Sequence, residues 1–259
     1  MRTPHYERDG IAIYRGDALE VLHALELPPI AAVLMDPPFA SGARTEAQKQ
    51  TSGAMLRGGR WANRPIDNDQ MTTAGFVWLM REAALAFVPA IVAGGSVLSF
   101  IDWRQWPNLV GALESVNLRA QTMIVWDKGA MGMGNGFRLQ HELILHAAKG
   151  TPRVFHRGTP NVLRRAREDN VDHPSPKPVP LLEDLLGVVT EPGDVVLDPF
   201  MGAGATLVAA QRLGRRAIGV ELEERYCDIA AERLAQTTLP VVMTSSGSSP
   251  TSEQVRLLP

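Results

Sequence analysis

The tetrapeptide Asp36-Pro37-Pro38-Phe39 is the segment of this sequence whose residue types and spacing most clearly suggest a catalytic role. It follows an apolar run, residues 31–35, that is typical of a buried strand. Two consecutive prolines remove backbone donors and fix φ, which stiffens the chain and leaves carbonyls with no adjacent N–H. The Asp36 carboxylate and the Pro37 carbonyl are then placed to accept the two hydrogens of an exocyclic amine, while Phe39 stacks on the ring. The alternative is a rigid turn after a strand.

Such an arrangement answers a specific chemical problem. The lone pair of a nucleobase amine is delocalised into the ring, so the amine is a poor nucleophile. Two fixed acceptors draw its hydrogens toward a tetrahedral arrangement and stabilise the positive charge that develops on nitrogen. Holding the nitrogen in line with an activated methyl group supplies the larger part of the rate acceleration, which is entropic. No covalent enzyme intermediate is needed, and we expect the single cysteine, Cys227, to serve core packing.

A second segment predicts a cofactor site. An apolar strand ends at Asp198, and a glycine-containing turn with Gly202 and Gly204 leads into a helix. Glycines at such a turn allow close approach of a ligand to the backbone, and doubly wound folds bind nucleotides at these strand ends. The following strand ends at Glu221, where a carboxylate can accept hydrogen bonds from both ribose hydroxyls. The alternative is a turn that only packs the helix on the strand.

The details of this turn favour a ribose-bearing ligand without phosphates. A dinucleotide fingerprint lacks its third glycine because position 207 is leucine, and the Gly-Lys-Ser/Thr of a P-loop is absent. No lysine or arginine in the turn neutralises a pyrophosphate. S-adenosylmethionine is the common ligand of this kind.

The elements around these segments alternate between strands and helices, which predicts a mostly parallel, doubly wound sheet. The expected strands are residues 11–14, 31–35, 96–101, 122–126, 142–148, 195–198 and 216–221. The expected helices are residues 72–88, 181–189, 205–213 and 224–235.

Composition bounds the remaining possibilities. The chain has 259 residues, 45% of them hydrophobic, which fits one large α/β domain over residues 1–239. Residues 240–259 are expected to form a flexible tail. A single cysteine excludes a disulfide scaffold and favours a reducing, cytoplasmic compartment. We see no membrane span, no secretory signal and no spacing of ligands that would bind a metal.

Charge is segregated although the net charge is only -2. Two basic segments, within loops expected at about 40–70 and 128–170, predict a surface that binds a polyanion; a merely solvated surface is the alternative. The candidate DNA contacts are Arg44, Lys49, Arg57, Arg60, Arg64, Lys128 and Arg138.

Taken together, the order of Asp36-Pro37-Pro38-Phe39 and the later Asp198-Pro199-Phe200-x-Gly202-x-Gly204 resembles the amino-group DNA methyltransferases, in particular their permuted β class. Further stretches agree over about residues 10–235: 16–22, 126–128, 138–142 and 173–178. The resemblance implies a Rossmann-like sheet of seven strands, mostly parallel with one antiparallel strand, and S-adenosylmethionine as methyl donor. It assigns to the cofactor Asp17, Ala18, His173, Lys177, Asp198, Pro199, Phe200, Gly202, Gly204, Thr206 and Glu221.

The resemblance also implies duplex DNA as substrate, with the target base flipped out of the stack. The leading Asp36 favours adenine, whereas cytosine at its exocyclic amine remains open. Phe39 stands where the family usually has tyrosine, which keeps stacking and loses a hydroxyl. A small recognition surface and the family together suggest a homodimer. RNA or a protein amide as substrate, and an idle DNA-binding module, are the alternatives; the complete Asp-Pro-Pro-Phe argues against the last.

Overall fold

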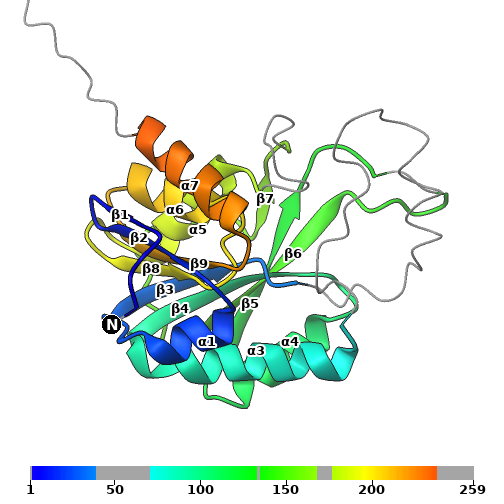
Figure 1. Ribbon diagram of the computed structural model, residues 1–259. Helices are drawn as coiled ribbons and strands as arrows, with labels where there is room; N and C mark the ends of the chain where they lie inside the picture. The colour runs from blue at the N-terminus through cyan, green and yellow to red at the C-terminus, as the bar shows by residue number, and fades with distance from the viewer. Residues whose placement is uncertain (1, 39–70, 133–134, 168–176, 238–259) are drawn as a thin grey trace, which may run out of the picture.

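The computed structural model describes residues 2–38, 71–132, 135–167 and 177–237. These residues form one sheet in the order β1-β2-β9-β8-β3-β4-β6-β5-β7, covered by helices on both faces (Figure 1). The strands are β1 (Tyr6–Arg8), β2 (Ile11–Arg15), β3 (Ile30–Met35), β4 (Ile91–Ile101), β5 (Arg119–Asp127), β6 (His141–Ala148), β7 (Val162–Arg164), β8 (Val195–Asp198) and β9 (Arg216–Glu221).

The sheet confirms the predicted fold class. Five neighbouring strands, β2, β9, β8, β3 and β4, run parallel, and β6 runs antiparallel to both of its neighbours, β4 and β5. The seven expected strands are all present. Two further strands of three residues each, β1 and β7, extend the sheet at its two edges.

Among the described residues, three α-helices cover each face. One face carries α1 (Ala18–Ala24), α3 (Thr73–Phe87) and α4 (Trp106–Glu114), and the other carries α5 (Val179–Val189), α6 (Ala205–Arg212) and α7 (Glu224–Thr237) (Figure 1). Local signals explain their ends: the Thr72 hydroxyl accepts the N–H of Gly75 at 3.1 Å and caps α3. The chain then leaves α3 through the 3-10 turn η1 (Val88–Ala90), which contains Pro89.

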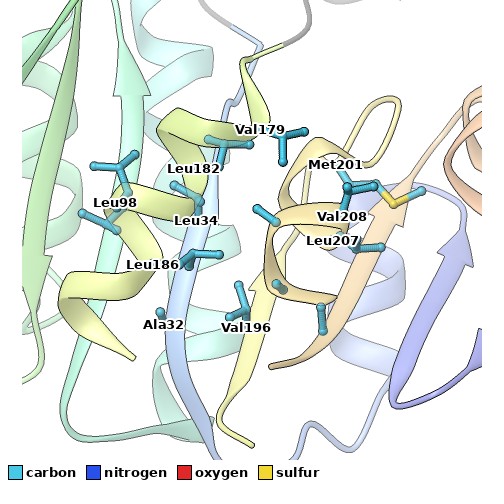
Figure 2. Close-up of a cluster of buried hydrophobic side chains, with 14 of the residues drawn as sticks. Ala32, Leu34, Leu98, Val179, Leu182, Leu186, Val196, Met201, Leu207 and Val208 are labelled. Carbon is cyan, nitrogen blue, oxygen red and sulfur yellow. The ribbon is translucent and has the colours of Figure 1, made fainter. Parts of the chain in front are cut away.

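Each face has its own hydrophobic core. On the α5–α6–α7 face, Leu182 and Leu186 of α5 meet Leu34 of β3 and Val208 of α6 (Figure 2). Cys227 of α7 is fully buried in the same cluster, which confirms the expected packing role. The alternation of strands and helices therefore buries both sides of the parallel strands, as continuous apolar strands such as β3 require.

The topology brings the two chemical segments together. Strands β3 and β8 are parallel neighbours with Val33 opposite Leu197, so their carboxyl ends lie at the same edge. After β3 the chain passes to α3 on one face, and after β8 it passes to α6 on the other. This is a topological switch point, where open α/β sheets bind ligands. No helix in the described part of the chain is long and apolar enough to span a bilayer.

Candidate active site

Asp36 stands at the tip of β3, immediately after its last residue. Its Oδ1 atom is buried and has no hydrogen-bond partner among the described residues. Its Oδ2 atom forms a close ion pair with the Nζ of Lys177. Burial raises the pKa of the Asp36 carboxyl, and the Lys177 ammonium opposes that rise. Within residues 2–38, 71–132, 135–167 and 177–237, the site thus presents one unpaired, buried acceptor oxygen, followed in the chain by the Pro37-Pro38 pair.

Lys177 belongs to a small network of buried charges. Its Nζ also lies 3.5 Å from Glu142 Oε2 at the start of β6, and 4.9 Å from the centre of the Phe100 ring of β4. Burial alone would lower the pKa of Lys177, but Asp36 and Glu142 together raise it, so the ammonium stays charged. The resemblance assigned Lys177 to the cofactor; in this structure its partner is the carboxylate of Asp36.

Glu142 is shared between two lysines. Its Oε1 pairs closely with Lys128, which follows β5 directly, and whose Nζ lies 5.1 Å from the centre of the Trp126 ring. Burial would raise the pKa of Glu142, but Lys177 and Lys128 together lower it. Sequence reasoning met Glu142 only inside a family segment and gave it no role. Its register opposite Trp126 in the β5–β6 ladder places it there, and no local signal reveals that pairing.

Asp198 ends β8 beside Asp36. It is 3% exposed, and its Oδ1 accepts the N–H of Phe200 at 3.0 Å. The pKa of Asp198 is raised to about 7, chiefly by burial and in smaller part by the charges of Asp36 and Glu221, against hydrogen bonds from Thr206 and Phe200 that lower it. A cationic ligand at this edge would relieve that mutual repulsion.

Glu221 and the turn after β8 form the next part of the edge. The two carboxylate oxygens of Glu221 accept the N–H groups of Gly202 at 3.1 Å and Glu223 at 2.7 Å. Burial raises its pKa, although these hydrogen bonds lower it. Each oxygen has a second lone pair, so Glu221 retains acceptors for ribose hydroxyls.

The two glycines of this turn have different tasks. Gly202 and Gly204 both have positive φ, 51° and 75°. A Cβ on Gly204 would lie 2.6 Å from Cβ of Ala230 in α7, so Gly204 does pack one helix against another. Gly202 instead turns its N–H to Glu221 and so fixes that carboxylate at the strand end.

Asp17 follows β2 on the far side of Glu221. Its Oδ1 accepts the N–H groups of Leu19 at 2.9 Å and Glu20 at 3.2 Å, which makes it the N-cap of α1. Ala18 is buried beneath it. The adjacent Gly16 donates its N–H to the Glu221 carbonyl at 2.9 Å, so the ends of β2 and β9 are tied together. An additional contact of Asp17 with the adenine of the cofactor stays a prediction.

These residues fit S-adenosylmethionine. The ligand carries a sulfonium and an ammonium group, and the edge offers the buried carboxyl of Asp198, whose pKa is raised by burial and by its carboxylate neighbours Asp36 and Glu221. Glu221 and Asp17 stand on two neighbouring strands, as a nucleoside needs for its ribose and base. A phosphate group placed at Asp17, Asp198 and Glu221 would meet three carboxylates.

The remaining predicted residues are distributed as follows. Phe39, His173, Arg44, Lys49, Arg57, Arg60 and Arg64 lie outside the described residues, as does the expected tail at 240–259. Pro199 and Thr206 are buried around Asp198, and Phe200 is half-buried. Arg138 is exposed on the loop between β5 and β6. Lys128 is 9% exposed and paired with Glu142, so a DNA contact through it stays a prediction.

The second basic segment does not form one surface. Arg138 and Arg164 lie at the edge that carries the site, Arg164 pairing with Asp127 at 3.8 Å. Lys149 binds the carbonyls of Val88 and Ile91 at the opposite edge. Arg153 pairs there with Glu191 and Asp194, at 3.7 and 3.9 Å. The sequence therefore predicted a larger basic surface than the structure shows. The reason is that β6 runs from the end of the sheet that carries the site to the opposite end, so residues before and after it are far apart.

Comparisons with known proteins agree with this geometry. Residues 158–232 match the model of the N6/N4 methylase family, described as DNA methylase. The chain is 28% identical to the Escherichia coli K12 protein named "Putative methylase YubD" over 85% of this chain and 88% of the relative. It is 52% identical to the type II methyltransferase M2.DpnII of Streptococcus pneumoniae, over 24% of this chain and 23% of that protein.

Solved structures show the same fold. The complex of M1.HpyAVI with S-adenosylmethionine has a TM-score of 0.65 at 23% identity, covering 86% of this chain and 98% of the other. The PvuII DNA methyltransferase, which is specific for cytosine N4, has a TM-score of 0.71 at 18% identity, covering 94% and 91%. The fold is that of the methyltransferases. The family match and the sequence relative support a DNA methyltransferase.

Proposed function

We propose that this chain methylates the exocyclic amino group of adenine at a specific site in duplex DNA. The observation that carries the proposal is the Oδ1 atom of Asp36: a buried acceptor with no hydrogen-bond partner in the described part of the chain, at the tip of β3 and beside β8. An unsatisfied buried carboxylate oxygen costs stability, and an N–H of a flipped base would satisfy it.

The chain's own residues then divide the work. Asp36 Oδ1 and the Pro37 carbonyl accept the two amine hydrogens, and Phe39 stacks on the base. The amine nitrogen must lose one proton as it gains the methyl group, and Asp36 is the acceptor closest to that proton. Asp198, Glu221 and Asp17 would hold S-adenosylmethionine, which supplies a methyl group activated by its sulfonium.

Adenine rather than cytosine is the proposed target because the motif begins with aspartate. The target base must leave the stack to reach a carboxylate at the sheet edge. We propose duplex DNA over RNA or a protein amide, since the matched relatives are DNA methylases. We also propose that the protein is a cytoplasmic homodimer. It would act either in a restriction-modification system or as a solitary enzyme. These parts of the proposal rest on the sequence alone.

The test is a methyl-transfer assay with tritiated S-adenosylmethionine on duplex DNA, RNA and bulk protein, followed by mass analysis of the product nucleosides. We expect label in DNA and N6-methyl-2'-deoxyadenosine among its deoxynucleosides. N4-methylcytosine would correct the target base, and label in RNA or protein alone would overturn the substrate. The Asp36→Ala variant serves as the inactive control. Separately, light scattering of the purified original protein determines its oligomeric state.

A further inference from the structure

Four buried or half-buried charges alternate in sign behind the proposed acceptor. The chain of contacts runs from Asp36 through Lys177 and Glu142 to Lys128, and its members come from the end of β3, the segment before α5, the start of β6 and the end of β5. The two lysine side chains are each 9% exposed, and the Glu142 side chain is 26% exposed.

A network of buried charges of this kind adds little to the stability of the fold, which suggests that it has a functional role. Removing charges from water carries a penalty that ion pairing often only balances, and apolar residues frequently stabilise a fold as well. The two lysines are also braced by aromatic rings, Phe100 under Lys177 and Trp126 under Lys128. Both rings are buried and meet edge to face with centroids 6.4 Å apart, so the bracing surface is itself rigid.

We propose that Glu142 and Lys128 are positioning residues that hold Lys177 on Asp36 Oδ2 and thereby leave Oδ1 as the oxygen that accepts the target amine. This inference rests on the proposed function. Lysine has a flexible four-carbon stem, and one carboxylate does not fix its ammonium. Glu142 supplies the second anchor and Lys128 fixes Glu142 from the other side. Asp36 is then held with one oxygen occupied and one open.

The alternation of charge gives each member a distinct influence on Asp36. The charged groups that face Asp36 are Lys177, Glu142 and Lys128 from the network and Asp198 from β8. The negative charge of Glu142 raises the pKa of Asp36, and the positive charge of Lys128 lowers it. Through its charge alone, removing Glu142 would shift the Asp36 pKa downward, and removing Lys128 would shift it upward. If Glu142 holds Lys177 in place, however, its removal also loosens the contact of Lys177 with Oδ2, and this larger effect shifts the Asp36 pKa upward.

The decisive set of variants is Glu142→Gln, Lys128→Met and the two combined. The double variant removes one charge of each sign, so it preserves the net charge of the site and controls for an unpaired buried ion. The Asp36 carboxyl is titrated by NMR in protein labelled with carboxyl-13C aspartate, and an Asp36→Asn spectrum identifies its signal. This readout does not depend on activity.

We expect the Asp36 pKa to rise in Glu142→Gln, because Lys177 is no longer held on Oδ2, to rise in Lys128→Met, and to stay raised in the double variant. A fall in Glu142→Gln would mean that Glu142 acts on Asp36 through its charge alone. We also expect kcat to drop about tenfold or more in both variants that lack Glu142, because Lys177 loses its second anchor. The KM values for DNA and for S-adenosylmethionine should stay unchanged.

Three outcomes would overturn the inference: an Asp36 pKa that is the same in all variants, a kcat that survives loss of Glu142, or a KM for DNA that rises in Lys128→Met, which would make Lys128 a DNA contact. Failure of the proposed function looks different. In that case the original chain transfers no methyl group to nucleic acid, while the carboxyl titration still reports whether the network acts on Asp36.

Discussion

Lys177 and Asp36, 141 residues apart in the chain, form a partly buried ion pair at the carboxyl edge of the sheet. Asp36 arrives at the end of β3, and Lys177 arrives on the segment that leads into α5 on the opposite face of the molecule from α3. The pair joins the segment that precedes the cofactor strand to the proposed catalytic strand. Lys177 thus has a direct means to influence the acceptor of the target amine.

Replacing Lys177 by methionine should reduce kcat and leave the affinity for S-adenosylmethionine unchanged. Without the ammonium, the cause that opposes burial at Asp36 is lost, so the pKa of Asp36 rises further. Only the ionised carboxylate accepts the amine, so the acid limb of kcat should move to higher pH. Methyl-transfer assays quenched at fixed times, from pH 5 to 9, measure kcat and its pH dependence. Calorimetry measures the affinity for S-adenosylmethionine. A weaker cofactor affinity with an unchanged pH profile would instead place Lys177 at the cofactor.

Cofactor affinity should depend on pH through Asp198. Its pKa of about 7 means that the folded protein holds a proton there which the unfolded chain, with an ordinary aspartate, has lost. Asp198 therefore adds stability at low pH that disappears as pH rises to about 7, above which its contribution is flat. A cationic ligand favours the ionised form, so affinity should rise about tenfold from pH 6 to pH 8.

Calorimetry in buffers of different ionisation enthalpy would count the proton released at pH 6. The Asp198→Asn variant keeps an acceptor for the Phe200 N–H and should bind with no such release. An equal proton count in this variant would assign the titration to another group, of which Asp36 and Glu221 are the nearest by their influence on Asp198.

The sequence predicted the parallel strands well because their signals are local. The bounds of strands β8 and β9 were predicted to the residue: β8 lies between Gly193 and Pro199, and β9 begins after the turn at Gly214 and ends where the acidic residues 223–224 follow. Strand β4 begins at Ile91, five residues before the predicted Ser96, because Gly94 and Gly95 interrupt the apolar pattern. Helix α1 was missed, since it has only seven residues and its cap, Asp17, had been given to the cofactor.

The residues of the site likewise fall into those that could be predicted from local signals and those that could not. Asp36, Asp198 and Glu221 each end a strand, and parallel neighbours bring such ends to one edge, so their meeting could be anticipated. The Lys177–Asp36 pair could not, because Lys177 lies in no regular element and its partner is set by how α5 packs on β3. Glu142 depends on the β5–β6 register, and a shift by one residue would turn it to the other face.

Gly204→Ala should destabilise the fold by about 1–3 kcal/mol, because the new methyl would meet Ala230 and alanine rarely adopts a positive φ. Gly187→Ala is the matched control: Gly187 lies within α5 with open space around it. That change should be neutral or stabilise by about 0.5–1 kcal/mol. Urea unfolding gives both numbers. A Gly204→Ala protein of unchanged stability would show that α6 and α7 can separate at no cost.

Arginines at the two edges of the sheet should differ in their contribution to DNA binding. Arg138 and Arg164 are exposed at the edge that holds Asp36, whereas Arg153 pairs with Glu191 and Asp194 at the other edge. Replacing Arg138 or Arg164 by glutamine should weaken binding to all duplexes alike and lower the slope of log K against log salt by about 1 each. Arg153→Gln removes the same charge from the protein and should leave the slope unchanged. Fluorescence anisotropy with a labelled duplex over a salt series measures these slopes. An equal loss from Arg153→Gln would show that net charge, rather than a defined face beside the site, draws the DNA to this protein.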